Sequence, residues 1–340
     1  MLKADSRTLL KLNRLVRSNR LKFAAALAAD VLGLRYTIVR MDPVAACNLR
    51  CAMCYYSDGD WYAANAGPRL TAARVERLAG AFFPEAVQVF IGCGSEPTMW
   101  KGYPDIVGLA KRYGVPFVSL VTNAQLLTQR TIEDLVTRGL DEIIVSVHGT
   151  DAATYERLMK GARWTRLHDN LKALTAVRDS LGSKTPALRI NFTVNNDNVG
   201  QIAELPAVFG PYSPATIQIR PIIDLGNTAY ADKDLSRSLE AYDAGIEQLR
   251  RDCAAAGIAL LANAHDPLYG SGQSGAKVYE NAVLRYIGPT RAWKTDFDVE
   301  RETYAGFKAR IGFRRSLLRW AVLGSRDLEH HTVLASSDVL

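Results

Sequence analysis

Cysteine is scarce in this chain: there are five in 340 residues, and three of them stand close together at Cys47, Cys51 and Cys54. The other two, Cys93 and Cys253, lie far apart, which excludes a disulfide framework of the kind that holds small secreted domains together. The Cys-x-x-x-Cys-x-x-Cys run offers three thiolates, whereas a closed metal site usually has four protein ligands. The missing fourth thiolate predicts a metal centre with an open position.

Long hydrophobic runs are also missing. The longest apolar stretch, near Phe23 to Leu34, is interrupted by Asp30 and is far shorter than the roughly 20 residues that cross a bilayer. No signal-peptide pattern stands at the start of the chain. We therefore expect a cytoplasmic, enzyme-sized globular protein, and its composition of 48% hydrophobic and 23% charged residues agrees with this.

The positive charge is concentrated at one end of the chain. Residues 1–40 hold nine basic and two acidic residues, which accounts for the whole net charge of +7. Leucine and valine recur at near-helical spacing from Leu9 to Val16, and a similar basic amphipathic pattern runs from Phe307 to Leu323. These helices could dock on the protein, attach to an anionic membrane surface at the inner membrane face, or bind an acidic partner. We expect no nucleic acid partner.

Short β-branched runs alternate with helical stretches from Tyr36 onward. Such alternation predicts a parallel sheet wrapped by helices. The turn-forming stretch from Asn263 to Gly275 marks a boundary. We therefore expect three parts: a basic helical arm over residues 1–35, an α/β barrel over residues 36–262, and a C-terminal extension over residues 263–340.

Polar segments follow successive strand-like runs. Gly94-Ser95-Glu96-Pro97 follows the second run, Asn123 ends the third, and Ser146 ends the fourth. Together with the cysteine run, these segments resemble the motifs of the radical S-adenosylmethionine (radical SAM) superfamily. The resemblance covers roughly residues 36–225 and is nearest to the SPASM/Twitch-type branch. The chain departs from that branch because it has no C-terminal cysteines for auxiliary clusters.

The resemblance implies a fold, cofactors and a site. The fold would be α/β, a partial (β/α)6 barrel with helical N- and C-terminal extensions. Cys47, Cys51 and Cys54 would hold three irons of one 4Fe-4S cluster, and SAM would chelate the fourth. One electron from a donor such as flavodoxin or ferredoxin would then cleave SAM and give a radical that abstracts hydrogen. The residues implied in SAM binding are Met53, Gly94, Ser95, Glu96, Asn123 and Ser146.

Several positions depart from the family pattern. Met53 replaces an aromatic residue, Ser95 and Ala124 each replace a glycine, and His148 replaces an aspartate. None of these changes removes a cluster ligand. The candidate catalytic or substrate-contacting residues are His148, Arg220 and Asp58, of which His148 could instead cap a structural contact and Asp58 could simply form a turn.

We expect an enzyme that abstracts hydrogen from a small biosynthetic molecule, such as a sugar, a nucleoside or a lipid-linked intermediate. The alternative enzyme is a peptide-modifying maturase. The missing cysteine-rich tail and the lack of an apparent leader-peptide-binding domain weaken that reading. A non-catalytic iron–sulfur or zinc protein is a further alternative. A fourth nearby cysteine would favour it, and none is close in sequence.

Overall fold

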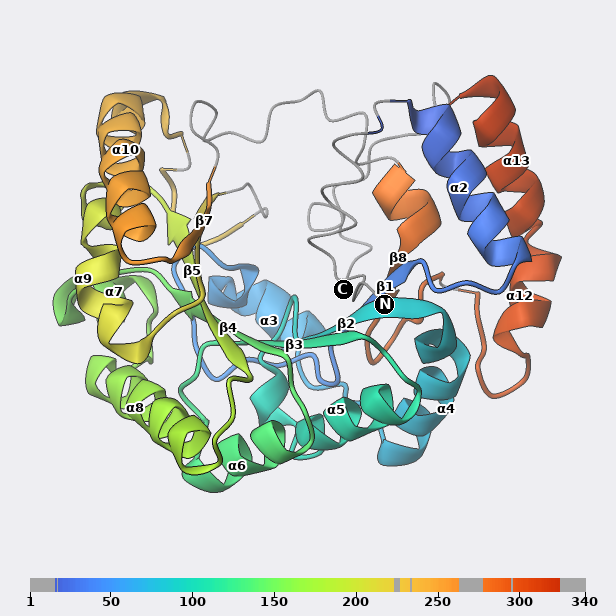
Figure 1. Ribbon diagram of the computed structural model, residues 1–340, viewed down its shortest axis with the longest axis horizontal. Helices are drawn as coiled ribbons and strands as arrows, with labels where there is room; N and C mark the ends of the chain where they lie inside the picture. Colours follow the sequence, from blue (N-terminus) through green and yellow to red (C-terminus); the bar gives the residue numbers. More distant parts are fainter. Residues whose placement is uncertain are drawn as a thin grey trace.

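The computed structural model describes residues 16, 18–222, 227–232, 234–262, 278–294 and 296–324. The predicted helix from Leu9 to Val16, apart from its last residue, and the boundary from Asn263 to Gly275 lie outside these residues. In the described part, one parallel sheet of eight strands forms the centre of the molecule, in the order β7-β6-β5-β4-β3-β2-β1-β8 (Figure 1). The strands are β1 (Thr37–Met41), β2 (Ala86–Ile91), β3 (Phe117–Thr122), β4 (Glu142–Val147), β5 (Ala187–Val194), β6 (Thr216–Pro221), β7 (Ala259–Leu261) and β8 (Leu284–Ile287).

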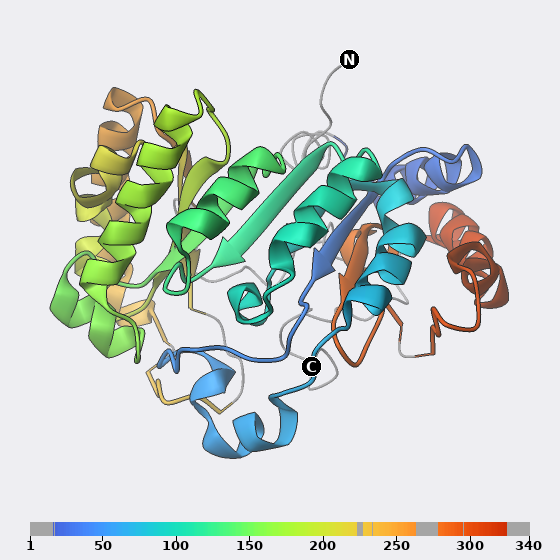
Figure 2. The ribbon, with the colours of Figure 1, turned by 90° about the horizontal axis from the view of Figure 1, so that it is seen from below.

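Helices connect the strands and cover the outer, convex face of the sheet (Figure 2). The α-helices are α2 (Asn19–Val31), α3 (Gly59–Asn65), α4 (Ala72–Phe82), α5 (Tyr103–Arg112), α6 (Gln129–Thr137), α7 (Ala152–Leu158), α8 (Trp164–Ser180), α9 (Leu205–Phe209), α10 (Leu239–Ala255), α12 (Tyr304–Arg310) and α13 (Phe313–Leu323). Short 3-10 turns are η1 (Tyr55–Ser57), η2 (Phe83–Glu85), η3 (Pro97–Met99), η4 (Val199–Glu204), η5 (Gly210–Tyr212) and η6 (Ser236–Ser238), and η7 (Tyr279–Val283) is a π-helical turn. The predicted partial α/β barrel is confirmed.

Alternation along the strands gives the sheet two different faces. On β4, for example, Ile143, Val145 and Val147 pack in the main core under the helices. The residues between them point to the opposite, concave face, which we call the inner face. Side chains there become only half-buried toward the carboxyl ends of the strands, as Ser146 does on β4. Parallel α/β folds place their chemistry at that end of the strands.

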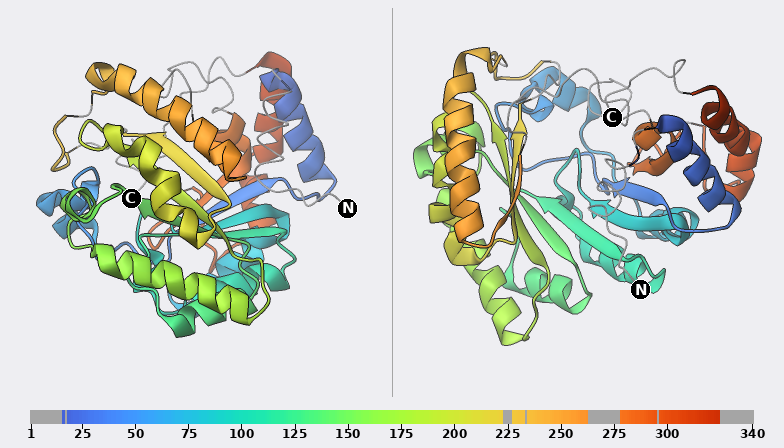
Figure 3. Two further views of the ribbon diagram at one scale, coloured as in Figure 1. Left: turned by 60° about the vertical axis from the view of Figure 1, so that its left-hand side comes forward. Right: turned by 45° about the horizontal axis from the view of Figure 1, so that its top comes forward.

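The C-terminal extension adds a strand to the sheet. β8 pairs in parallel with β1, from Ile38 opposite Leu284 to Met41 opposite Ile287. The single helix predicted from Phe307 to Leu323 is instead two helices, because Gly312 adopts a left-handed conformation with φ of 62° between α12 and α13. Helix α13 packs alongside α2 from the other end of the chain (Figure 3).

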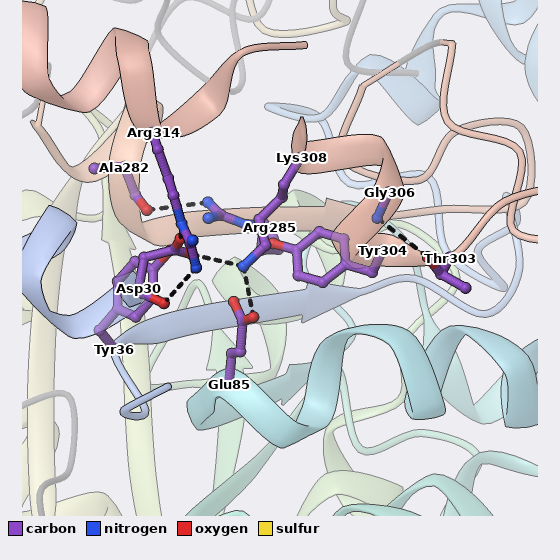
Figure 4. A network of polar contacts seen from close by, with 10 residues as sticks. All are labelled: Asp30, Tyr36, Glu85, Ala282, Arg285, Thr303, Tyr304, Gly306, Lys308 and Arg314. Carbon is purple, nitrogen blue, oxygen red and sulfur yellow. Dashed lines mark hydrogen bonds and ion pairs between the residues drawn. The ribbon is translucent and has the colours of Figure 1, made fainter. Parts of the chain in front are cut away.

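A buried ionic network holds these terminal helices on the sheet (Figure 4). The fully buried carboxylate of Asp30 on α2 accepts hydrogen bonds from Lys308 at 2.6 Å, Arg314 at 2.7 Å and Tyr36 at 2.9 Å. Lys308 also pairs with Glu85 at 2.6 Å. Burial alone would raise the pKa of Asp30, but the hydrogen bonds from Arg314 and Lys308 outweigh it and the pKa is lowered. The carboxylate therefore stays ionised between its two cations.

Candidate active site

The three clustered cysteines lie in the loop between β1 and η1, and that loop is tied down at several points. Backbone N–H groups of Arg50 and Ala52 donate to the carbonyl groups of Lys160 and Leu158 at the end of α7, both at 2.9 Å. The Arg50 guanidinium also donates to the Cys47 carbonyl at 2.9 Å and lies 3.7 Å from the centre of the Tyr62 ring. These contacts hold the loop that carries the three thiols against α3 and α7.

The thiols form a group whose chemistry suits metal binding. Burial raises the pKa of Cys47 to about 12 and that of Cys54 to about 11, and it raises the pKa of Cys51 well above its usual value. After burial, the strongest effect on Cys51 is repulsion from Cys54 and Cys47, so the three sulfur atoms share one neighbourhood. Thiolates held there need a compensating positive centre.

The three thiols fit the ligand set of a multi-iron cluster. In the described part of the chain, no group of three or more His, Cys, Asp or Glu side chains could hold one metal ion. A cluster does not require that convergence, because each thiolate binds a different iron. Cys47, Cys51 and Cys54 are all free and partly exposed, as ligands of a cluster with one open iron would be.

Asp42, at the end of β1, organises the Gly94–Glu96 segment. Its carboxylate accepts hydrogen bonds from the backbone N–H of Cys93 at 2.7 Å and of Gly94 at 3.0 Å, and from the Ser95 hydroxyl at 3.1 Å. The Tyr286 hydroxyl of β8 donates to the same carboxylate at 2.8 Å. Asp42 is buried and its pKa is raised by burial, although these hydrogen bonds oppose the rise. Ser95 therefore forms a hydrogen bond to Asp42 that a glycine, the usual family residue at this position, could not form.

Glu96 joins the ends of β2 and β3. Its buried carboxylate accepts from the Thr122 hydroxyl at 2.7 Å, the Asn123 N–H at 2.8 Å and the Thr98 hydroxyl at 2.6 Å. Burial raises its pKa, and these hydrogen bonds oppose the rise. Glu96 thus positions the strand ends, and its predicted contact with SAM stays a prediction.

Asn123 lies beside the cysteine loop. Its amide nitrogen donates to the Asn48 side chain at 2.9 Å and lies 3.9 Å from the Cys47 sulfur. The next residue, Ala124, has a positive φ of 60°, a conformation that glycine adopts without strain. This backbone conformation explains why a glycine is the usual family residue there. In this chain the Ala124 carbonyl accepts a hydrogen bond from the Asn170 side chain at 2.6 Å, which stabilises the conformation.

Three other predicted site residues have clear structural partners. Asp58 caps α3 by accepting from the N–H of Asp60 at 3.0 Å and of Trp61 at 3.1 Å. The sulfur of buried Met53 accepts a hydrogen bond from the Asn195 side-chain amide at 2.8 Å. His148 follows the half-buried Ser146 at the end of β4, and burial lowers the pKa of its imidazole to about 4. His148 is therefore neutral at pH 7.

Two arginines face the same thiol on the inner face. On β1, Val39 and Met41 pack in the core, so Arg40 points to the inner face; by the same alternation Arg220 does so on β6. Burial raises the pKa of Cys93 to about 12, and the positive charges of Arg40 and Arg220 both oppose that rise. Arg40 and Arg220 thus both act on the Cys93 thiol, although they come from strands near opposite edges of the sheet.

Sequence reasoning singled out Arg220 and missed Arg40, Asp42 and Tyr286. The alternation of Val39 and Met41 with Arg40 and Asp42 was a signal for the first two. Nothing in the sequence pairs Tyr286 with Asp42, because 244 positions separate them.

The fold is a half-open parallel α/β barrel, and three clustered thiols lie in the loop after its first strand. Residues 41–187 match the family model of the radical SAM superfamily. The cofactors that this match implies are a 4Fe-4S cluster and SAM. Cys47, Cys51 and Cys54 are the residues that would hold the cluster.

The chain is similar to curated relatives in sequence and to a solved structure in fold. A probable GTP 3',8-cyclase of Saccharolobus solfataricus is 28% identical over 218 residues, which cover 63% of this chain and 66% of that protein. GTP 3',8-cyclase of Xanthomonas campestris pv. campestris is 32% identical over 188 residues, covering 54% and 53%. The structure of Streptococcus suis SuiB bound to SAM has a TM-score of 0.61 at 17% identity and covers 81% of this chain and 68% of SuiB. The chain thus matches only part of the length of each relative.

Proposed function

We propose that the protein is a radical SAM enzyme that abstracts hydrogen from a small anionic biosynthetic molecule bound on the inner face of the sheet. When bound, the cluster and SAM supply the radical that takes the hydrogen. The observation that carries the choice of substrate class is that Arg40 and Arg220 both lie half-buried on the inner face of the sheet. Two guanidinium groups on this face suit a phosphate or carboxylate.

Arg40 has Tyr279, Cys93 and Asp42 as neighbours. Asp42 directs its hydrogen bonds to Cys93, Gly94, Ser95 and Tyr286. Arg40 lies against the Tyr279 ring, 5.9 Å from its centre, and stays half-buried. Tyr279, Cys93 and Asp42 raise the pKa of Arg40, Tyr279 most strongly, so the guanidinium stays charged.

The arginine deeper on the inner face is different. Arg189 makes a two-armed ion pair with Glu142, at 2.7 and 2.8 Å, and also donates to Gln218 at 3.2 Å. The polar groups of Arg189, Glu142 and Gln218 thus bond to one another, and these residues form the bottom of the inner face below the proposed site. Next to it, the buried Oδ1 atom of Asn191 has no hydrogen-bond partner among the described residues, so a donor on a ligand would recover the cost of burying that atom.

Nucleotides belong to this substrate class, and the names of the relatives point to one. GTP 3',8-cyclases are named for a nucleotide substrate, and a lipid-linked or phosphorylated sugar carries the same anionic group. The runner-up is a peptide substrate. A SuiB structure contains a precursor peptide, but at 16% identity that likeness supports only the fold.

Anaerobic protein reconstituted with iron and sulfide tests the proposal. It is incubated with SAM, dithionite and deuterated nucleotides, sugar phosphates or peptides, and 5′-deoxyadenosine is analysed by mass. Deuterium transfer from an anionic metabolite is expected, with at least a tenfold rise in KM for Arg40→Met and Arg220→Met. Arg166→Met on the exposed surface of α8 is the matched control. Transfer from a peptide only, or an unchanged KM in both variants, would contradict the proposed substrate class.

A further inference from the structure

The two ends of the chain meet in one pair of helices. Phe23 of α2 and Trp320 of α13 have ring centres 5.1 Å apart. The Arg20 guanidinium at the start of α2 donates to the Leu323 carbonyl at the end of α13 at 3.5 Å. The helices therefore lie side by side in opposite directions, beside β1 and β8 (Figures 1 and 3).

The outward side of this pair is unusually apolar. Among the described residues, every large hydrophobic side chain that is more than half exposed lies on α2, directly after it, or on α13. Exposed alanines fill the rest of the outer side of α2. The more than half-exposed residues are Leu21 (63%), Val31 (57%), Leu32 (69%), Leu34 (55%), Leu318 (53%), Val322 (60%) and Leu323 (58%).

Among the described residues of α2 and α13, the exposed charges on this side have one sign. Arg20, Arg315 and Arg319 are exposed around Leu21, Leu318 and Leu323. Helix α13 has no acidic residue, and the one acid of α2, Asp30, is buried. We call Arg20, Leu21, Arg315, Leu318, Arg319, Val322 and Leu323 the terminal-helix surface.

We propose that the terminal-helix surface docks on an anionic lipid bilayer. Basic side chains beside exposed leucines on one helical face are the features that bind the bilayer interface. A second copy of this chain would present the same positive charge, and like charges disfavour that contact. In the described part of the chain no helix is long and apolar enough to cross a membrane, so the contact is with the lipid surface.

Other basic residues of the terminal helices are held in ion pairs and do not contribute to the proposed lipid contact. Arg314 donates to Asp30 at 2.7 Å and Lys308 is buried in the same network. Arg310 pairs with Asp296 at 3.0 Å and Glu302 at 2.8 Å. Arg20, Arg315 and Arg319 are exposed and lie beside the exposed leucines, so they are the basic residues of the proposed contact, whereas replacement of Arg314 would test folding instead.

Co-sedimentation of the reconstituted full chain with vesicles tests the proposal. Vesicles of phosphatidylglycerol and phosphatidylcholine are compared with phosphatidylcholine alone, at low and high salt. We expect binding only to the anionic vesicles, weakened by salt. The bound fraction should fall at least fivefold in Leu318→Gln/Val322→Gln and in Arg315→Gln/Arg319→Gln.

Matched controls carry the same substitutions elsewhere. Leu181→Gln, at a side chain 49% exposed after α8, and Arg130→Gln/Arg166→Gln on α6 and α8 should change the bound fraction less than twofold. Retained SAM cleavage verifies that each variant is folded. Equal binding to neutral vesicles, no binding at low salt, or a dimer in light scattering that the surface variants abolish would each overturn the proposal, the last by assigning the surface to a second copy.

Discussion

At the residue scale, the cluster site depends on three side chains with no local substitute. Replacing any one of Cys47, Cys51 and Cys54 by alanine should abolish reductive SAM cleavage, because each thiolate would bind a separate iron and the nearest other cysteine, Cys93, lies next to Arg40 and Arg220. Iron analysis and 5′-deoxyadenosine formation measure the effect, with Cys253→Ala in the core as the control. Stoichiometric zinc without iron in anaerobically purified wild type would refute it.

Asp42 is the second critical residue, because it orients the backbone of the predicted SAM-binding segment. Asp42→Asn should weaken SAM binding at least tenfold, since an amide nitrogen would face N–H donors and a charged hydrogen bond is worth about 1.5–3 kcal/mol. Ser95→Gly should lose less than about threefold, because it removes one of several donors. Calorimetry on the reconstituted protein compares the two, and equal losses would show that Asp42 does not act through the backbone of Cys93 and Gly94.

His148 makes stability depend on pH. Its folded pKa of about 4 lies below the ordinary value of 6.5, so the unfolded chain binds more protons between these values. Stability is therefore lost as the pH falls, by about 2 kcal/mol from pH 7.5 to pH 5.0. Urea unfolding at both pH values should show that His148→Gln loses about that much less than the wild type. An identical pH dependence in the variant would remove His148 as the cause.

At the scale of elements, one carboxylate joins α2 to α12 and α13. Asp30→Asn should reduce the free energy of unfolding by about 3 kcal/mol, because it leaves buried Lys308 with only Glu85 as a partner. Asp169→Asn, in an exposed pair with Lys172 at 3.9 Å, should cost less than about 1 kcal/mol. Chemical denaturation measures both. A similar small loss in both variants would mean that the terminal helices are held by apolar packing alone.

At the scale of the whole molecule, β8 makes the C-terminal extension part of the same sheet. Trp293 connects β8 to α12 and α13. It is buried and lies 4.0 Å from the Arg285 guanidinium of β8. On its other side it contacts the rings of Tyr304, Phe307 and Phe313. Trp293→Ala should cost about 3–5 kcal/mol. Hydrogen exchange should then quicken in both β8 and β1, whereas faster exchange confined to α12 and α13 would show that this segment unfolds by itself.

The sequence by itself determined the alternating sheet, the cysteine loop and the strand-end motifs. These are local patterns: the alternation of β-branched runs with helical stretches, and three thiols within eight positions. The chemistry of the cluster follows from residues adjacent in the chain, so it is readable without a structure.

Only the tertiary structure decided which distant residues meet. Asp30 and Lys308 are 278 positions apart, and Tyr286 reaches Asp42 across 244. β8, four residues long, has too short a pattern to predict, and Arg40 and Arg220 both act on Cys93 although β1 and β6 lie near opposite edges of the sheet. The terminal-helix surface arises in the same way. The sequence predicted a helical arm over residues 1–35 and an amphipathic helix from Phe307 to Leu323, but only the packing of α2 on α13 selects the side chains that remain outside.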